Sequence, residues 1–205
     1  MPSDAVTDPN EALKQKWDQR HASAEGVGDV AAVLAENIHL LPPAGDALDL
    51  ACGRGASAIR LARAGLRITA WDLSPVAIER LNSAAREQRL AIAAEVRDVI
   101  ARPPAPESFD LILVSYFLER ALAPAIIQAL RPGGLLFYQT FSVNAVSDCG
   151  PSNPAFRLQE NELLKLFQPL KVRVYREEGR LGDCRFGTRD IAMLVAQKPG
   201  INDNF

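Results

Sequence analysis

The stretch DLACGRG, residues 49–55, decides the fold, because it joins an apolar run to an amphipathic run through a glycine-rich turn. The apolar run predicts a strand over residues 47–51, and the amphipathic run predicts a helix over residues 56–64. Gly53 and Gly55 allow the backbone to turn tightly and to approach a ligand closely, and the first turn of the helix presents unpaired N–H groups. The stretch therefore predicts a ligand site between the first strand and the helix that follows it.

Beyond residue 45, the chain alternates between short apolar runs and longer amphipathic runs. Further strands are expected at residues 67–71, 91–97, 111–114, 135–141, 170–177 and 191–197, and further helices from Pro75 and at residues 118–130 and 159–167. Gly65 is expected to end the first helix in a left-handed conformation, and Ser74 is expected to cap the next one. The alternation predicts an α/β fold with a doubly wound, mostly parallel sheet and helices on both faces. No helix is expected between the last two strands, which favours an antiparallel pair.

The expected organisation is a single domain over residues 1–205, because that length suits one large domain and is too short for two ordinary ones. A helical amino-terminal extension is expected at residues 1–44, and the core of the domain at residues 45–198. Residues 142–157 are rich in Asn, Ser, Gly and Pro, and a loop of that length is expected to act as a lid.

The composition excludes several classes of protein. Hydrophobic residues make up 48% of the chain and charged residues 23%, which excludes a disordered or coiled-coil protein. A net charge of -2 disfavours nucleic acid as a partner. The spacing of Cys52, Cys149 and Cys184 suits neither a disulfide framework nor a metal site, so no metal is expected. The first residues do not resemble a signal peptide, and no apolar stretch approaches the roughly 20 residues of a membrane helix, so a cytoplasmic protein without a membrane partner is expected.

Acidic residues narrow the choice of ligand. Asp72 closes the second expected strand, where a carboxylate can bind the hydroxyls of a ribose. Asp98 closes the third, where it could accept a hydrogen bond from the amino group of adenine. Asp49 lies beside the glycine turn, where it would repel a pyrophosphate and attract an ammonium group. This arrangement suits an amino-acid zwitterion joined to adenosine, although the glycine spacing also fits a dinucleotide fingerprint.

At these positions the sequence resembles the class I S-adenosylmethionine-dependent methyltransferases over roughly residues 40–198. The resemblance rests on residues 49–55, Asp72, Asp98, residues 109–112 and residues 130–134. It implies a Rossmann-like sheet of seven strands in the order 3-2-1-4-5-7-6 with the last strand antiparallel, and S-adenosylmethionine as the cofactor. It also implies in-line SN2 displacement of the methyl group onto a small-molecule acceptor. Ala51 departs from the family's pattern, because many members have glycine there.

The resemblance also implies roles for single residues. Asp49 would reach the methionine ammonium, Asp72 the ribose, and Asp98 the adenine. Ser115 would lie beneath the transferable methyl group. The residues expected to bind the cofactor are Asp49, Ala51, Gly53, Gly55, Asp72, Leu73, Asp98, Val99, Ser115, Trp17 and Arg20. Trp17 and Arg20 are expected to close over it from the amino-terminal helix, with Arg20 pairing its carboxylate; the alternative is an amphipathic helix that leaves Arg20 in water.

Within the superfamily, four short segments resemble the tellurite-resistance and thiol S-methyltransferases. They are residues 17–20, 150–154, 161–164 and 192–198. Only His21 and His39 are present, and this scarcity of bases favours a thiol or chalcogen nucleophile, because a thiol is already partly ionised at neutral pH. The alternative is an acceptor that needs a base, for which the candidates are Asp148, Glu119, Tyr116 and His21.

Candidate residues for the acceptor pocket are Tyr116 and Arg185. Arg180, Arg185 and Arg189 precede the last strand, where they either bind an anionic acceptor or belong to a solvated hairpin. The tellurite-resistance relatives carry a histidine in this region and this chain does not, which weighs against tellurite as the substrate.

Two alternatives to a methyltransferase remain open on the sequence. One is an NAD-dependent oxidoreductase or a nucleotide-binding module that uses the same glycine turn. The other is a catalytically inactive protein that binds S-adenosylmethionine and serves as a partner for another protein. The sequence does not indicate an oligomeric state.

Overall fold

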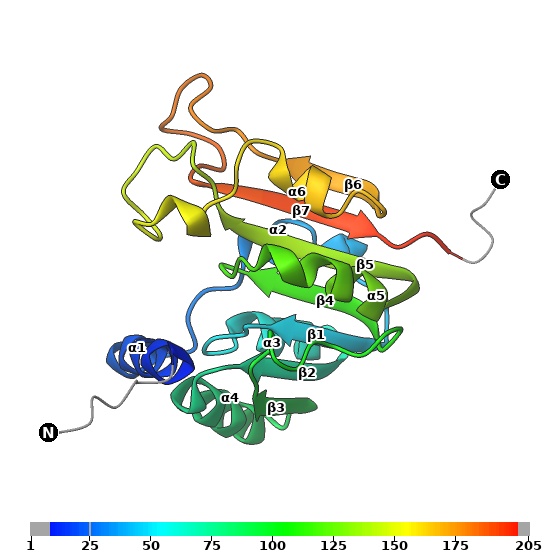
Figure 1. Ribbon diagram of the computed structural model, residues 1–205. Helices are drawn as coiled ribbons and strands as arrows, with labels where there is room; N and C mark the ends of the chain where they lie inside the picture. The colour runs from blue at the N-terminus through cyan, green and yellow to red at the C-terminus, as the bar shows by residue number, and fades with distance from the viewer. Residues whose placement is uncertain (1–8, 25, 201–205) are drawn as a thin grey trace, which may run out of the picture.

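The computed structural model describes residues 9–24 and 26–200, and its centre is one sheet of seven strands (Figure 1). The strands are β1 (Asp46–Leu50), β2 (Arg67–Asp72), β3 (Ile92–Val96), β4 (Phe109–Ser115), β5 (Leu130–Phe141), β6 (Lys171–Arg176) and β7 (Ile191–Gln197). Their order is β3-β2-β1-β4-β5-β7-β6, and β7 is antiparallel to both of its neighbours. The fold class, strand order and antiparallel last strand expected from the sequence are confirmed.

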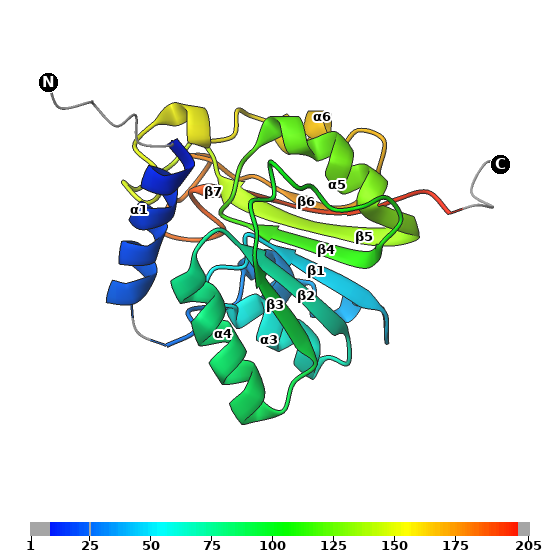
Figure 2. The same ribbon diagram turned by 60° about the horizontal axis from the view of Figure 1, so that its bottom comes forward.

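Helices cover both faces of the sheet (Figure 2). The α-helices are α1 (Pro9–Ser23), α2 (Ala32–Glu36), α3 (Ala56–Arg63), α4 (Pro75–Gln88), α5 (Ala123–Ala129) and α6 (Glu162–Leu166). Helices α2, α3 and α4 pack on one face, and α5 and α6 pack on the other. Successive side chains of a strand point to opposite faces. Accordingly, Ile112 is buried in the apolar cluster on the α5 side and Leu113 in the cluster on the α3 side.

The turns that follow β1 and β2 have the expected chemistry. Gly65 has a φ of 100° after α3, in the left-handed region that a side chain would disfavour. The Ser74 hydroxyl caps α4 by accepting a hydrogen bond from the Ala77 N–H at 3.2 Å. The turn at Gly65 follows the end of α3, and the Ser74 cap marks the start of α4.

The helix expected over residues 118–130 is shorter in the structure, and the strand after it begins earlier. A 3₁₀ turn at Arg120–Leu122 precedes α5, and β5 begins at Leu130. The Gly133 N–H donates to the Lys198 carbonyl at 3.0 Å, and the Lys198 N–H donates to the Gly134 carbonyl at 2.9 Å. The segment expected to be only a turn is therefore held in the sheet by the chain that follows β7.

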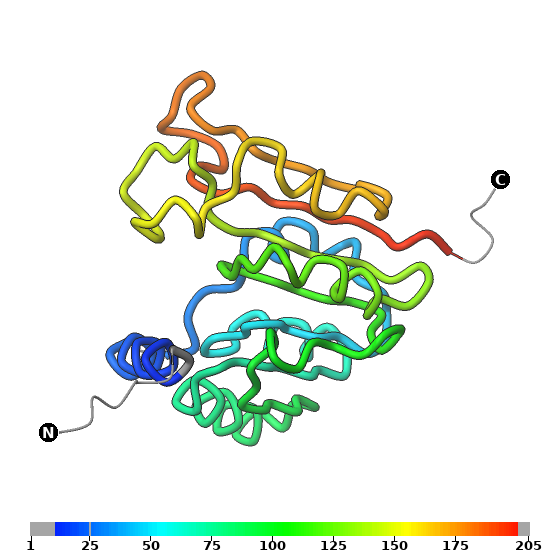
Figure 3. Tube along the Cα trace, viewed as in Figure 1, coloured from blue at the N-terminus to red at the C-terminus, as the bar shows by residue number. Residues whose placement is uncertain are grey.

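Three segments gather beside the carboxyl ends of the parallel strands, at the left of Figures 1 and 3. They are α1, residues 142–157 and the loop at residues 177–190 between β6 and β7. In doubly wound sheets this end carries the ligand site. Among the described residues, no helix is long and apolar enough to cross a membrane.

Candidate active site

The register of the sheet places the main polar side chains on one face. Asp49 pairs with Leu113 on β4, and Leu113 pairs with Phe137 on β5. Two residues further toward the carboxyl ends, and therefore on the same face, Ser115 pairs with Gln139. Asp49, Ser115 and Gln139 thus approach the open end of the sheet from three neighbouring strands.

Asp49 is a buried acidic residue on this face of the sheet. Its side chain is 1% exposed, and neither carboxylate oxygen has a well-formed hydrogen bond to any described residue. Burial raises the pKa of Asp49 to about 7, with a smaller raising effect from Asp72 and a partial opposing effect from the Ala58 backbone N–H. A buried carboxylate without a partner fits a ligand that brings its own positive charge.

The glycine turn is held by Asp72. One oxygen of its buried carboxylate accepts the Gly53 N–H at 2.8 Å, and the other accepts the Ser74 N–H at 2.9 Å. Gly53 has a φ of 52°, and Gly55, the N-cap residue directly before α3, has a φ of 88°. A Cβ atom on Gly55 would collide with the side chain of Leu81, so this glycine is needed for packing. Each Asp72 oxygen keeps a further lone pair with which it can bind a hydroxyl.

Two residues without the freedom of glycine adopt left-handed conformations at the ends of adjacent strands. Ala51 follows β1 with a φ of 57°, and Tyr116 follows β4 with a φ of 55°. Such conformations are unfavourable for residues with a side chain and often mark functional sites. The two strained residues therefore lie at the same end of the sheet, each directly after the end of its strand.

Helix α1 covers the glycine turn. A Cβ atom on Gly53 would lie 3.4 Å from His21 Cε1, and the His21 ring stacks on Trp17 with centroids 5.9 Å apart. Asp18 forms a short hydrogen bond with the Ser74 hydroxyl, which fixes α1 to the start of α4. Burial lowers the pKa of His21, opposed by the negative charge of Asp72. The sequence offered His21 only as one of four side chains that could serve as a base, and the structure places it beside the glycine turn.

The other expected residues of α1 are placed differently. Trp17 is half-buried beside His21, whereas Arg20 is exposed and its guanidinium lies 5.5 Å from the centre of the Trp17 ring. The Arg80 guanidinium donates to the Ala22 carbonyl at 3.0 Å and so holds the end of α1. The roles of Trp17 and Arg20 toward a cofactor stay predictions.

The residues expected around adenine lie in the turn after β3. Asp98 accepts hydrogen bonds from the Ile100 and Ala101 N–H groups at 2.9 and 3.1 Å. Val99 is buried in the apolar core, and Leu73 is half-buried next to Asp72. Their contacts to a cofactor also stay predictions.

The segment expected to be a lid lies against the end of β5. The Arg157 guanidinium donates to the carbonyls of Ser142 at 3.0 Å, Pro151 at 2.9 Å and Cys149 at 2.5 Å. Gly150 packs on the Phe141 ring, because a Cβ atom there would meet that ring at 2.6 Å. The Tyr116 ring lies 4.9 Å from the same ring. Tyr116, Phe141 and residues 142–157 therefore lie against one another, and the role of this segment as a lid stays a prediction.

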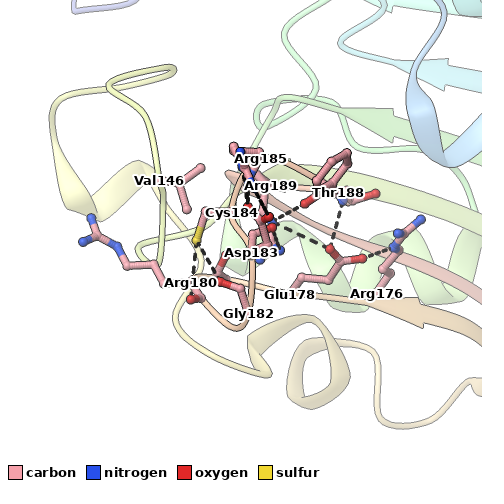
Figure 4. Close-up of polar contacts among 12 residues, drawn as sticks. Val146, Arg176, Glu178, Arg180, Gly182, Asp183, Cys184, Arg185, Thr188 and Arg189 are labelled. Atoms are coloured by element: carbon pink, nitrogen blue, oxygen red, sulfur yellow. Dashed lines mark hydrogen bonds and ion pairs between the residues drawn. The ribbon is translucent and has the colours of Figure 1, made fainter.

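The loop between β6 and β7 is built around its own charged groups (Figure 4). Arg189 donates to the Phe186, Gly179 and Asp183 carbonyls, at 2.7, 2.8 and 3.0 Å. Arg180 donates to the Ala145 carbonyl of the lid at 2.8 Å. Arg185 pairs with Asp183 at 2.7 Å, and its side chain is 82% exposed. Among the described residues, Arg185 contacts Asp183 and Phe186 and Tyr116 contacts Phe141, and the roles of Arg185 and Tyr116 toward an acceptor stay predictions.

Comparison with known proteins matches residues 47–134 to the model of a methyltransferase domain family. Hemagglutinin 1 of Eikenella corrodens is 30% identical over 205 aligned residues, which cover 91% of this chain and 65% of that protein. The ubiquinone biosynthesis O-methyltransferase of Xylella fastidiosa strain 9a5c is 35% identical over 103 residues, covering 46% of this chain and 41% of that enzyme.

The probable S-adenosyl-L-methionine-dependent methyltransferase TehB of Haemophilus influenzae strain KW20 is similar in both sequence and structure. It is 29% identical over 136 residues, covering 63% of this chain and 47% of TehB. A crystal structure of TehB from Haemophilus influenzae superposes with a TM-score of 0.68 at 20% identity, over 89% of this chain and 67% of that one. In sequence, the chain thus spans less than two thirds of the length of each of the three curated relatives.

Proposed function

We propose that this chain transfers the methyl group of S-adenosylmethionine to a thiol or heavier chalcogen of a small molecule. The proposal starts from the match of residues 47–134 to a methyltransferase domain family and from the likeness to TehB, a probable S-adenosyl-L-methionine-dependent methyltransferase. The resemblance to S-adenosylmethionine-dependent methyltransferases, expected from the sequence, is confirmed, together with the enzyme class and cofactor of the domain, and the likeness to TehB agrees with it. The nature of the acceptor is the part that we add.

The observation that carries the proposal is the buried, unpartnered carboxylate of Asp49. S-adenosylmethionine supplies a methyl group on a positively charged sulfonium, and its methionine part carries an ammonium group. Asp49 is suited to hold that ammonium, and Asp72, which fixes the glycine turn, is suited to hold the ribose. A diphosphate ligand such as NAD would instead bring negative charge toward Asp49.

The proposed task of the protein is mainly orientation. Holding the acceptor in line with the methyl group can be worth roughly 7 to 11 kcal/mol without a proton shuttle. Tyr116 would not serve as a base near neutral pH, because burial raises the pKa of its hydroxyl and keeps the proton in place. A thiol needs little help with its proton, since a few per cent is ionised at neutral pH.

A second candidate acceptor is a phenol, and the position of His21 favours it. The ring lies over Gly53, and its lowered pKa leaves it neutral and able to accept a proton at neutral pH. The Xylella fastidiosa relative is named as an O-methyltransferase, which is consistent with this candidate.

Two measurements test the proposal. Calorimetric titration with S-adenosylmethionine, S-adenosylhomocysteine and NAD should show binding of the first two; binding of NAD alone would reject it. Transfer of labelled methyl groups should then be followed with thiols, selenite, tellurite and phenols. Activity on phenols alone would favour the second candidate, and no product on any acceptor would favour a binding protein without catalysis.

His21 distinguishes the two acceptors further. With a phenol, His21→Gln should remove the limb of the pH–rate profile that lies below the ordinary histidine pKa of about 6.5. With a thiol, the same substitution should leave the shape of the profile unchanged. His39→Gln is the matched control, because His39 is exposed in the 3₁₀ turn Ile38–Leu40.

A further inference from the structure

The amide of Gln139 has a fixed orientation. Its side chain is 0% exposed, and its Oε1 atom accepts the Val33 N–H of α2 at 2.7 Å. A backbone N–H can only donate, so the oxygen of the amide must face Val33 and the Nε2 atom must face the other way. The direction in which Gln139 offers its N–H groups is therefore determined by α2.

The Nε2 atom of Gln139 is buried and has no well-formed hydrogen bond within the described residues. A buried donor without a partner is unfavourable and calls for an explanation in the site. Tyr116 is its neighbour, because the Tyr116 ring packs on Phe141, which lies two residues after Gln139 on the same face of β5. The Gln139 amide accordingly lowers the pKa of the Tyr116 hydroxyl, against the larger raising effect of burial. The free donor of Gln139 thus lies beside the side chain of Tyr116.

Tyr116 is placed to meet an acceptor. It follows Ser115 at the end of β4, its backbone N–H donates to the Gln139 carbonyl at 2.9 Å, and its side chain is 51% exposed. The left-handed backbone turns it toward Phe141 and the lid. Tyr116 therefore connects the buried amide with the open side of the site.

We propose that Gln139 is a positioning residue, which donates to the Tyr116 oxygen and so directs the Tyr116 O–H toward an anionic oxygen, a carboxylate, on the methyl acceptor. The proposal rests on the proposed function, because it concerns the acceptor of that reaction. Hydrogen bonds would then run in one direction, from the Val33 N–H to Gln139, from Gln139 to Tyr116, and from Tyr116 to the acceptor.

The direction of this chain determines the chemical class that is favoured. With Gln139 donating to its oxygen, Tyr116 has its proton available for an outside acceptor of hydrogen bonds. A bond from a hydroxyl to a carboxylate is stronger than one to a neutral amide. An acceptor that carries a carboxylate is therefore selected over one with a neutral group of the same shape.

The test uses thiols in matched pairs that differ only in this group. The pairs are 3-mercaptopropionate with 3-mercaptopropionamide, and 4-mercaptobenzoate with 4-mercaptobenzamide. Their dissociation constants are measured on the full chain loaded with S-adenosylhomocysteine, and kcat/KM is measured wherever methyl transfer occurs. The wild-type protein should prefer the carboxylate in at least one pair by tenfold or more. Equal binding within both pairs, or binding of no probe, would overturn the proposal.

Two substitutions then examine the chain of hydrogen bonds. Gln139→Glu keeps an oxygen for the Val33 N–H but presents an acceptor to Tyr116, which reverses the direction of the Tyr116 O–H. Tyr116→Phe removes that O–H. Each should reduce the preference for the carboxylate about tenfold without weakening the amide probe, and the double variant should be no worse than Tyr116→Phe. An unchanged preference in Gln139→Glu would reject the positioning role.

Matched controls separate this proposal from simple destabilisation and from failure of the proposed function. Tyr175→Phe on β6 and Gln197→Glu on β7 repeat the chemical changes elsewhere and should leave the preference unchanged. Binding of S-adenosylhomocysteine should persist in all variants. If the wild-type protein does not bind S-adenosylhomocysteine, the proposed function itself fails; if it binds but the carboxylate preference is absent, only the present proposal fails.

Discussion

The carboxylate of Asp72 accepts a hydrogen bond from the Gly53 N–H at 2.8 Å, so the residue that ends β2 fixes the turn that follows β1. The second oxygen of Asp72 accepts the Ser74 N–H at the start of α4. One buried side chain therefore joins both turns that are expected to hold the cofactor. Asp72 therefore stabilises the two turns and is also a candidate ligand for the ribose.

Replacing Asp72 should affect stability and cofactor affinity together. Asp72→Ala leaves two N–H groups without their acceptor, and we expect the free energy of unfolding to fall by about 1–3 kcal/mol. Asp72→Asn keeps one acceptor oxygen and should lose less. Urea denaturation and calorimetric titration with S-adenosylhomocysteine measure the two effects. A fully stable Asp72→Ala protein would show that the turns do not depend on this carboxylate.

Replacing Asp49 should change the stability of the fold and the affinity for the cofactor in opposite directions. The pKa of Asp49 is about 7 in the fold against about 3.9 in an unfolded chain, so ionisation opposes folding as the pH rises between these values. The cost is complete above pH 7 and amounts to about 4 kcal/mol. Asp49→Asn should therefore raise the melting temperature at pH 8, have little effect near pH 4, and weaken binding of S-adenosylmethionine severely.

The wild-type protein offers an independent check on the same residue. Pairing with an ammonium group favours the ionised carboxylate, so binding of the cofactor below pH 7 should release a proton. Calorimetry in buffers of different ionisation enthalpy measures that release. Binding without proton release at pH 6, or unchanged affinity in Asp49→Asn, would contradict the role assigned to Asp49.

The left-handed conformation of Ala51 should be relieved by glycine. A residue with a Cβ atom is destabilised by roughly 1–2 kcal/mol in this conformation, and glycine removes that strain. Part of the gain is offset, because glycine loses more conformational entropy on folding. We expect Ala51→Gly to stabilise the protein by about 1 kcal/mol in thermal or urea unfolding. Ala84→Gly, in the interior of α4, is the control and should cost about 1 kcal/mol. Destabilisation by Ala51→Gly would mean that the alanine methyl group is needed for packing.

The lid should depend on Arg157. Its guanidinium binds three carbonyls of residues 142–151, and Arg157→Ala removes all of these bonds. We expect faster proteolysis within residues 142–157 with little change in global unfolding, because the core clusters do not include Arg157. Limited proteolysis followed by mass spectrometry locates the cuts. The control is Arg86→Ala on the exposed side of α4, which should leave the pattern unchanged.

The sheet order and the positions of Asp49 and Asp72 at one edge of the sheet could be predicted because their signals are local. The apolar runs mark the strands, the glycines mark the turn, and Asp49 and Asp72 lie at strand ends that any parallel sheet brings to one edge. The early start of β5 could not be predicted, because it depends on Lys198 bonding to the Gly133 region after the sheet has formed.

The acceptor side depends on contacts between distant segments. Gln139 lies within an apolar strand, and only the Val33 N–H, 106 residues away, fixes its amide. His21 reaches the site only because Asp18 and Arg80 dock α1 against α4. The left-handed backbone of Tyr116 has no signal in the sequence, since left-handed turns are predicted from glycine or asparagine.

Polar contacts dominate the docking of α1, notably the Asp18–Ser74 bond and the Arg80 bond to the Ala22 carbonyl, while Leu13 remains 41% exposed. Such bonds can be exchanged for bonds to water at low cost, whereas parting the leucines and phenylalanines of the sheet would expose large apolar areas. In the proposed function, exchange of the cofactor therefore does not require the core of the protein to open. S-adenosylhomocysteine is expected to leave, and S-adenosylmethionine to enter, when α1 separates from α4 while the core stays folded.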